Sequence, residues 1–231
     1  MPKKTIVVIG FGPGVSSAVA DRFAAEGYAV ALVARSADRL AAGVEALKSK
    51  GAEAAAFAAD AGDADAIGAA IGKAREALGP IGAVHWNAYG GGEVGDLLAA
   101  DPRAVRGVFD IAVVGLLAAV QAALSDLKAA GDGAVLVTNG AFGSLSPAMD
   151  DLTVALKTMG VGLANAAKAK LVGQLSARLK ADGIYVGEVT IAGIVKGTAW
   201  DTGQGAIDPA RIADAFWKLY KGRDEIRAMV S

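Results

Sequence analysis

The sequence predicts one α/β domain over residues 1–231, with a doubly wound parallel sheet of six to seven strands and helices on both faces. Short apolar runs rich in β-branched residues alternate with longer Ala-rich segments of helical period, which is typical of repeated strand–helix–strand units. No linker, repeat or low-complexity tract divides the chain. Hydrophobic residues make up 54% of it, so a large buried core is expected.

The first part of the chain predicts four strands separated by three helices. Apolar runs indicate strands at Ile6–Ile9, Tyr28–Val33, Ala54–Ala59 and Ile81–Trp86. Helical periodicity indicates helices at Ser16–Glu26, Ala37–Lys50 and Asp63–Leu78, each followed by a glycine that suits a helix end. The alanines of the third strand would equally suit a helix.

The second part continues the same alternation. Strands are expected at Ala134–Thr138, Ile184–Val189 and, as a short last strand, Glu225–Val230. Helices are expected from Pro102 to about Ala130, from Leu152 to Lys180 and from Pro209 to Leu219. Proline is favoured in the first turn of a helix, and the pair Asp150-Asp151 suits the positive end of the long helix as caps.

Charge and residue counts exclude several classes of function. Lys and Arg number 23 against 24 Asp and Glu, and a net charge of -1 provides no positive field for nucleic acid. The absence of cysteine excludes disulfides, thiolate catalysis and Cys-based metal sites, and one histidine leaves little for an imidazole site, so no metal is expected. A reducing cytoplasm is the expected location.

Two apolar segments bear on membranes and assembly. The charged start Met1–Lys4 precedes an apolar run that is too short for a signal peptide and predicts a strand instead. The run Ile111–Val120 is about half the length that crosses a bilayer, so a buried helix and no membrane are expected. The helices from Pro102 and from Leu152 are apolar around most of their circumference, which favours a homodimer or homotetramer.

A glycine-rich loop, Gly10-Phe11-Gly12-Pro13-Gly14-Val15-Ser16, joins the first strand to the first helix. Glycines let the backbone approach a pyrophosphate, and the N–H groups of the helix start hold its charge. The alternative is a tight turn in a flavodoxin-like protein without a nucleotide. The place of the loop in the first strand–helix–strand unit favours a Rossmann-type dinucleotide site made by Gly10, Gly12, Gly14 and Val15.

The second strand runs into Arg35 and Ser36, which bear on the choice of cofactor. A carboxylate at this place binds the ribose hydroxyls of NAD, whereas a guanidinium and a hydroxyl suit the 2′-phosphate of NADP. The sequence therefore predicts NADP(H) in preference to NAD(H), with a solvated arginine after the strand as the alternative.

With these residues the chain resembles the short-chain dehydrogenase/reductase superfamily over nearly its whole length. The family's T-G-x-x-x-G-x-G falls on residues 9–16, with matches at Gly10 and Gly14. Asp60-Ala61 resembles the family's Asp-Val pair at the adenine, and Asn87-Ala88 resembles the middle of its N-N-A-G. Residues 192–195 resemble its P-G-x-V/I segment, so the resemblance implies that Val195 contacts the nicotinamide carboxamide.

The catalytic positions of the resemblance are mostly replaced. The family uses a Tyr as acid or base, a Lys four residues on that lowers its pKa and binds the nicotinamide ribose, a Ser that orients the carbonyl and an Asn relay. On this chain these positions fall on Thr153, Lys157, Gly140 and Ala112. A Thr hydroxyl has no pKa near 7 and is shorter than a phenol. Lys157, one helical turn from Thr153, is expected to face the ribose.

Three other side chains have two interpretations each, and Asn139 has one. Tyr89 is a displaced phenol donor or a packing residue, and Asn139 beside the replaced Ser donates a hydrogen bond to a substrate oxygen without supplying a proton. His85 inside the fourth strand predicts a buried structural imidazole rather than a base. Trp200 lies where the family has its mobile lid, and contacts an apolar substrate or simply packs.

The sequence leads to an NADP(H)-dependent oxidoreductase with a non-standard active site, acting on a carbonyl or alcohol that it does not name. The retained Lys157 and the segment ending at Val195 favour this function. The alternative is a catalytically inactive NADP(H)-binding protein, a sensor or a partner subunit, which the replaced Tyr and Ser favour. No residue points to a lyase or an isomerase.

Overall fold

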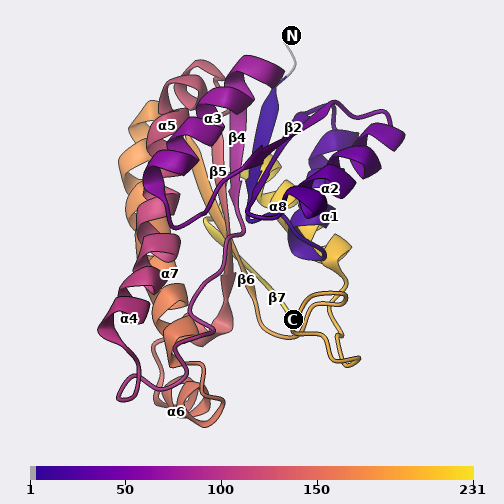
Figure 1. Cartoon of the computed structure of the whole chain (residues 1–231). Helices are drawn as coiled ribbons and strands as arrows, with labels where there is room; N and C mark the ends of the chain where they lie inside the picture. Colours follow the sequence, from indigo (N-terminus) through magenta and orange to yellow (C-terminus); the bar gives the residue numbers. More distant parts are fainter. Residues whose placement is uncertain (1–3) are drawn as a thin grey trace.

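A single seven-stranded parallel sheet forms the centre of the computed structural model, which describes residues 4–231 (Figure 1). Met1–Lys3, the first part of the segment compared above with a signal peptide, lie outside the described residues. The strands are β1 Thr5–Ile9, β2 Ala29–Ala34, β3 Ala54–Ala58, β4 Ile81–Trp86, β5 Ala134–Gly140, β6 Tyr185–Ile191 and β7 Arg227–Val230. Their order, β3-β2-β1-β4-β5-β6-β7, confirms the predicted fold class.

Helices cover both faces of the sheet. One face carries α1 Val15–Ala25, α2 Ala37–Ser49 and α8 Pro209–Gly222, whose buried side chains include Phe23, Leu40 and Phe216. The other carries α3 Ala64–Leu78, α5 Leu116–Ala129 and α7 Met159–Leu179. The chain leaves β3 at one edge and returns to β4 on the far side of β1. This reversal opens a crevice at the carboxyl ends of β1 and β4.

The Ala-rich segment that would equally suit a helix is strand β3. Its register with β2 runs from Val30↔Ala54 to Ala34↔Ala58, so its backbone groups bond to the neighbouring strand on one side. Tertiary pairing here outweighs the intrinsic preference of alanine for helix.

The helix expected from Pro102 to about Ala130 is continuous but changes its winding. It consists of α4 Pro102–Phe109, the π-helical η1 Asp110–Gly115 and α5. By length and composition it could cross a membrane, with a mean hydropathy of 2.0 over its most apolar window, of which 39% is buried. Leu116, Ala119 and Ala123 pack against the sheet, so the apolar residues on this face of the helix belong to the core.

The single helix expected from Leu152 to Lys180 is wrong. The structure has α6 Pro147–Ala155 and α7, separated by Leu156, Lys157 and Thr158. Lys157 has a φ of 53°, a left-handed conformation that interrupts helical hydrogen bonding. Ser146 accepts the N–H of Met149 as the N-cap of α6, so Asp150 and Asp151 lie within the helix and do not cap it.

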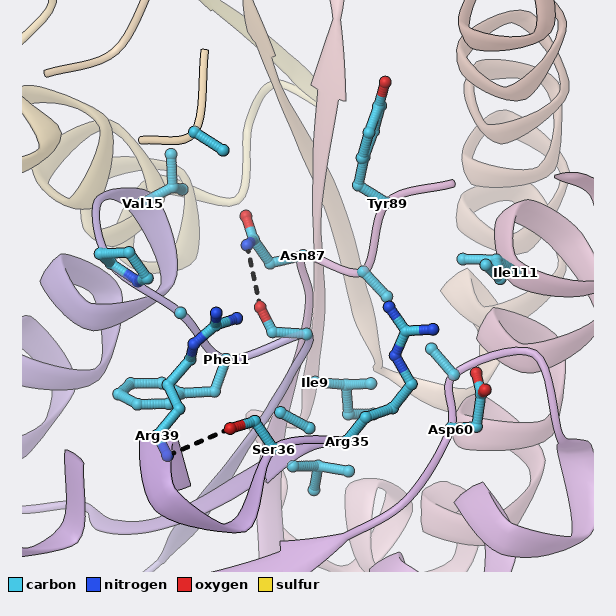
Figure 2. A pocket seen from close by; sticks show the side chains of 18 of the residues that line it. Ile9, Phe11, Val15, Arg35, Ser36, Arg39, Asp60, Asn87, Tyr89 and Ile111 are labelled. Carbon is cyan, nitrogen blue, oxygen red and sulfur yellow. Dashed lines mark hydrogen bonds between the residues drawn. The ribbon is translucent and has the colours of Figure 1, made fainter. Parts of the chain in front are cut away.

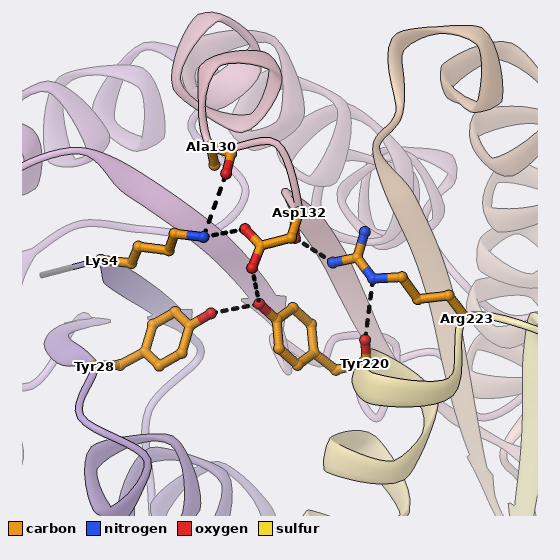
Figure 3. Close-up of polar contacts among 6 residues, drawn as sticks. All are labelled: Lys4, Tyr28, Ala130, Asp132, Tyr220 and Arg223. Carbon is orange, nitrogen blue, oxygen red and sulfur yellow. Dashed lines mark hydrogen bonds and ion pairs between the residues drawn. The ribbon is translucent and has the colours of Figure 1, made fainter. Parts of the chain in front are cut away.

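A polar cluster with two buried tyrosines lies at the amino ends of the strands, at the other end of the sheet from the crevice (Figure 3). The Tyr28 and Tyr220 hydroxyls are 2.5 Å apart, and Tyr220 donates to the Asp132 carboxylate at 3.1 Å. Lys4 forms an ion pair with Asp132, and Arg223 donates to the Asp132 carbonyl. Burial, and then the Tyr220 hydroxyl, raise the pKa of Tyr28. The cluster ties β1 and α8 to the turn before β5.

We expect Tyr220→Phe to lower the free energy of unfolding by about 1–3 kcal/mol, because Tyr28 and Asp132 each lose a buried partner. Urea denaturation measures the change. Tyr89→Phe is the matched control, since the hydroxyl of Tyr89 has no hydrogen bond within the described residues and its loss should change the value by no more than about 0.5 kcal/mol. Equal stabilities of the two variants would contradict a stabilising role for the cluster.

Candidate functional site

The crevice at the carboxyl ends of β1 and β4 holds a cavity of about 490 Å³. This size lies in the range of about 300–1,000 Å³ typical of ligand pockets. Five chain segments and the Ile111 side chain meet there. Its lining is residues 9–13 and Val15, residues 33–36 with Arg39, residues 59–61, Asn87, Ala88, Tyr89 and Ile111, and residues 198–200.

Close backbone contacts hold the glycine loop in its observed shape. Gly10 has a φ of 80°, and a Cβ on it would stand 2.4 Å from the backbone nitrogen of Ala88. A Cβ on Gly14 would stand 2.6 Å from Thr198 Cγ2. Ser16 Oγ accepts the Gly12 N–H at 2.9 Å and donates to the Gly12 carbonyl at 3.0 Å. The loop can approach Ala88 and Thr198 this closely only because Gly10 and Gly14 carry no side chain.

Two guanidinium groups stand at one end of the cavity, on either side of Ser36 in Figure 2. Arg35 follows β2, and Ser36 caps α2 by accepting the Arg39 N–H at 3.3 Å. Arg39 Nη1 lies 3.5 Å from the position of a Cβ on Gly12, so it reaches the glycine loop. The sequence analysis missed Arg39. Arg39 lies four residues after Arg35, at the start of the helix that borders the loop, and this spacing could have predicted it as a second cation of the site.

The neighbouring part of the cavity is lined by Asp60, Ala61 and Ile111. Asp60 Oδ1 accepts the Gly62 N–H at 3.0 Å, which fixes the loop after β3. The π-helical η1 carries Ile111 to the cavity, and a Cβ on Gly115 would stand 2.0 Å from the Ala61 carbonyl oxygen. The close approach of η1 to this loop therefore depends on Gly115.

Tyr89 and Trp200 form the other end of the cavity. Their rings meet edge to face with centroids 5.8 Å apart, and their exposed fractions are 44% and 53%. Burial and the Glu93 carboxylate raise the pKa of Tyr89 to about 12, so its phenol keeps its proton near neutral pH. This packing and pKa favour the interpretation of Tyr89 as a packing residue. Trp200 both packs and lines the cavity.

The segment that carries Trp200 is held by one carboxylate. Asp201 accepts the N–H groups of Gly197, Gly203 and Gly205 at 3.0, 2.8 and 2.7 Å. These bonds lower the pKa of Asp201. Val195, which precedes the segment, pairs with Ile207 and is not part of the cavity lining. Its contact with a nicotinamide stays a prediction.

The proposed arrangement of Thr153 and Lys157 is not what the structure shows. Because the helix breaks between them, Lys157 is not one helical turn beyond Thr153; it is exposed, and neither residue lines the cavity. Thr153 donates its hydroxyl proton to the Asp150 carbonyl at 2.9 Å. At the start of α7 the buried residues include Val161 and Asn165, which are spaced four apart.

Asn139 is tied to Asn165 at the end of β5. Its Nδ2 donates to the Asn165 carbonyl at 3.0 Å, and its Oδ1 accepts the Gly140 N–H at 3.0 Å. Both bonds occupy the Asn139 amide, so it acts on the backbone and does not line the cavity. The sequence analysis missed Asn165, because only the fold brings it beside Gly140.

Charged and polar side chains are buried on both faces of β5. Lys168 Nζ donates to the Thr138 carbonyl at 3.1 Å, and His85 Nε2 and Thr138 Oγ1 form a 3.0 Å hydrogen bond. Burial lowers the pKa of Lys168 to about 8, a fall that the buried Glu188 carboxylate opposes. His85 packs on Phe216, so it is a buried imidazole as the sequence indicates. Within residues 4–231, no group of three or more His, Asp or Glu side chains is placed to hold a metal.

Comparisons with known proteins converge on one family. The model of the short chain dehydrogenase family matches residues 4–201. An alcohol dehydrogenase from the archaeon Thermococcus sibiricus, complexed with 5-hydroxy-NADP, is 23% identical with a TM-score of 0.82, covering 99% of this chain and 96% of that one. L-sorbose reductase from Gluconobacter frateurii, complexed with NADPH and L-sorbose, is 19% identical with a TM-score of 0.85, covering 100% and 96%.

A third solved structure is similar in fold and has an unusual centre. It is the NADPH-bound short chain oxidoreductase from Pseudomonas aeruginosa PAO1 containing an atypical catalytic center. It is 22% identical to this chain with a TM-score of 0.86, and the match covers 99% of this chain and 95% of that one. Identities at this level establish the common fold.

We expect stability to fall in acid because of His85. Burial lowers its pKa from 6.5 to about 3, so between these values the unfolded state binds more protons than the folded state. The free energy of unfolding contributed by this group is therefore lost as pH falls from 6.5 towards 3, by up to about 1.4 kcal/mol per pH unit.

Urea denaturation between pH 7.5 and 4.5 tests this expectation in the wild type and in His85→Gln. The free energy of unfolding should fall less steeply with falling pH in the variant than in the wild type, because glutamine does not titrate. This difference in slope does not depend on the stability of the variant at pH 7.5. Parallel curves for the two proteins would contradict the assignment.

Proposed function

The chain belongs to the short-chain dehydrogenase family, and from this premise we propose that it is an NADP(H)-dependent oxidoreductase acting on a carbonyl or alcohol substrate. The observation that carries the proposal is the single cavity that joins the glycine loop to Arg35 and Arg39. Gly10 and Gly12 line this cavity without a side chain of their own, and the loop opens the first helix, so the residues present fit a dinucleotide.

The cationic end of the cavity supports NADP(H) over NAD(H). Arg35 and Arg39 supply two guanidinium groups, and Ser36 supplies a hydroxyl, beside the ribose position that follows β2 in this fold. No carboxylate follows β2 directly, since residues 34–37 are Ala, Arg, Ser and Ala. We propose that these three side chains bind the 2′-phosphate, and that Asp60, Ala61 and Ile111 enclose the adenine.

In the proposed reaction, bound NADPH supplies a hydride. The chain contributes orientation and exclusion of water: Asn87 Nδ2 holds the Gly10 carbonyl at 3.2 Å, and Trp200 closes on Tyr89 at the far end. An inactive NADP(H)-binding protein is the second candidate. It is favoured because no acid with a pKa near neutrality lines the cavity among the described residues.

Hydride transfer separates these two candidates. We expect the protein to oxidise NADPH in the presence of at least one aldehyde or ketone from a panel of aliphatic and aromatic compounds, followed by loss of absorbance at the reduced nicotinamide band. Tight NADPH binding with no turnover of any panel member would support the inactive binding protein.

Removing either guanidinium should weaken NADPH selectively. A hydrogen bond to a charged group contributes about 1.5–3 kcal/mol, so Arg35→Ala and Arg39→Ala should each raise the Kd for NADPH by about 10- to 100-fold. NADH lacks the 2′-phosphate, and its Kd should change little. Calorimetric titration with both nucleotides measures the difference. Arg103→Ala is the control, because Arg103 is exposed on α4 and does not line the cavity. Equal weakening of NADPH and NADH would exclude a 2′-phosphate role.

We also propose that the outer faces of η1–α5 and α7 form a subunit interface. Val114 is 44% exposed, and the apolar side chains around it are only half-buried. These half-buried residues are Val113, Leu117, Leu124, Leu163, Leu171 and Leu175. Light scattering at micromolar concentration should show a dimer or tetramer, and Val114→Asp should shift it towards monomer. Ala46→Asp, on the opposite helix layer, should leave the mass unchanged. A monomeric wild type would overturn this proposal.

A further inference from the structure

The end of β5 lies beside the end of β4, whose continuation lines the cavity. The register pairs Trp86 with Val137, so the chain beyond it brings Asn139 and Gly140 alongside Ala88. Adjacent strands are about 4.8 Å apart. The end of β5 therefore lies just beyond Asn87 and Ala88, next to the cavity lining but outside it, and the side chain that stands over it is Asn165 from α7.

Asn165 offers a buried amide that nothing uses. It is 4% exposed, and its side-chain amide has no hydrogen bond with any of residues 4–231, although its backbone carbonyl accepts from Asn139. Its Nδ2 lies 2.7 Å from the position that a Cβ on Gly140 would take. Gly140 thus leaves the space that the amide occupies. The amide is therefore an unengaged donor beside the end of β5, and its atoms are not among the fully enclosed polar atoms that lack a partner in the described residues.

The surroundings hold this amide in place. Asn139 ties the end of β5 to the Asn165 carbonyl, and Lys168, one turn along α7, ties the Thr138 carbonyl to the same helix. Lys168 is buried on the α7 side of β5, and the buried Glu188 carboxylate there opposes the fall in the Lys168 pKa that burial causes. Fixed donors in a poorly hydrated site stabilise negative charge well.

Other candidate donors are engaged or distant. The Thr153 hydroxyl proton is given to the Asp150 carbonyl, Lys157 is exposed outside the cavity, and Tyr89 packs on Trp200 at its mouth. The amide of Asn165 is the donor left at the end of β5.

We propose that Asn165 donates an N–H of Nδ2 to the carbonyl oxygen of the substrate and polarises it for reduction. The proposal rests on the oxidoreductase function proposed above. The hydride leaves NADPH, which becomes NADP+, and forms a C–H bond at the carbonyl carbon as the C=O π electrons move to oxygen. The amide stabilises that oxygen without losing a proton, and a water molecule protonates it to the alcohol, leaving hydroxide.

The test uses isobutyramide labelled with 13C at its carbonyl, an unreactive carbonyl compound, added to the full-length protein with saturating NADPH. A hydrogen bond to the oxygen draws electron density from the carbonyl carbon, so its NMR resonance should move downfield in the wild type. In Asn165→Ala this shift should vanish and the Kd of the probe should rise by about 3- to 10-fold, the effect of one lost hydrogen bond. Lys170→Ala, on the exposed face of α7, is the control.

A second pair of variants separates this role from a structural one. Gly140→Ala should lose the shift, because its Cβ would stand 2.7 Å from Asn165 Nδ2. The double variant Gly140→Ala with Asn165→Gly removes that clash. Its NADPH binding and its melting temperature should equal those of the wild type, but the downfield shift of the probe should still be absent. For any ketone that the protein reduces, Asn165→Ala should lower kcat by about 100- to 1,000-fold.

The outcomes distinguish the two proposals. NADPH binding with no downfield shift in the wild type, or a shift that persists in Asn165→Ala, overturns the role of Asn165 and leaves the cofactor site standing. Failure of the wild type to bind NADPH overturns the proposed function, and the role of Asn165 with it.

Discussion

The close approach of the turn after β1 to the turn after β4 is the constraint on which the site depends. Gly10 adopts a φ of 80°, and a Cβ at this residue would lie 2.4 Å from the Ala88 nitrogen, so any side chain would push the two turns apart. β1 is the strand at which the direction of winding reverses, and Ile6–Ile9 are completely or almost completely buried. The crevice, the glycine loop and the contact of Asn87 with the Gly10 carbonyl all follow from this approach.

Local patterns in the sequence predicted most of the fold and the phosphate-binding part of the site. β-branched runs, Gly27 and Gly51 after helices, and the glycine loop are short-range signals, and each corresponds to an observed element. The break at Lys157 carries no such signal: no Gly or Pro marks it, and a residue with positive φ there is held by its surroundings. The sequence therefore predicted one continuous helix here, and the expected one-turn spacing of Thr153 and Lys157 was wrong.

Two residues could not be predicted from the sequence because their contacts join segments that are far apart along the chain. Asn165 becomes significant only when α7 is laid along β5, and Lys168 only when its ammonium is seen against the Thr138 carbonyl. Both would count as ordinary polar residues of an Ala-rich helix. Burial changes the chemistry of Lys168, whose pKa it depresses, and the Asn165 amide has no hydrogen-bond partner among the described side chains and backbone groups. A polar layer between α7 and the sheet thus makes this half of the molecule chemically different from the apolar layer beneath α3.

The bonds of Asp201 to three backbone N–H groups have a consequence for how the protein can change over evolutionary time. The bonds to Asp201 do not use the side chains of Ala199 and Trp200, so these two can be exchanged without removing those bonds. The Thr198 hydroxyl, by contrast, donates to the Val195 carbonyl at 2.9 Å and supports the loop. The Asp201 carboxylate thus supports the backbone of the loop, while the side chains of the loop face the cavity mouth. Lineages that keep an aspartate at this position and glycines around it could therefore diversify in what they accept at the cavity mouth while inheriting the same nucleotide cradle.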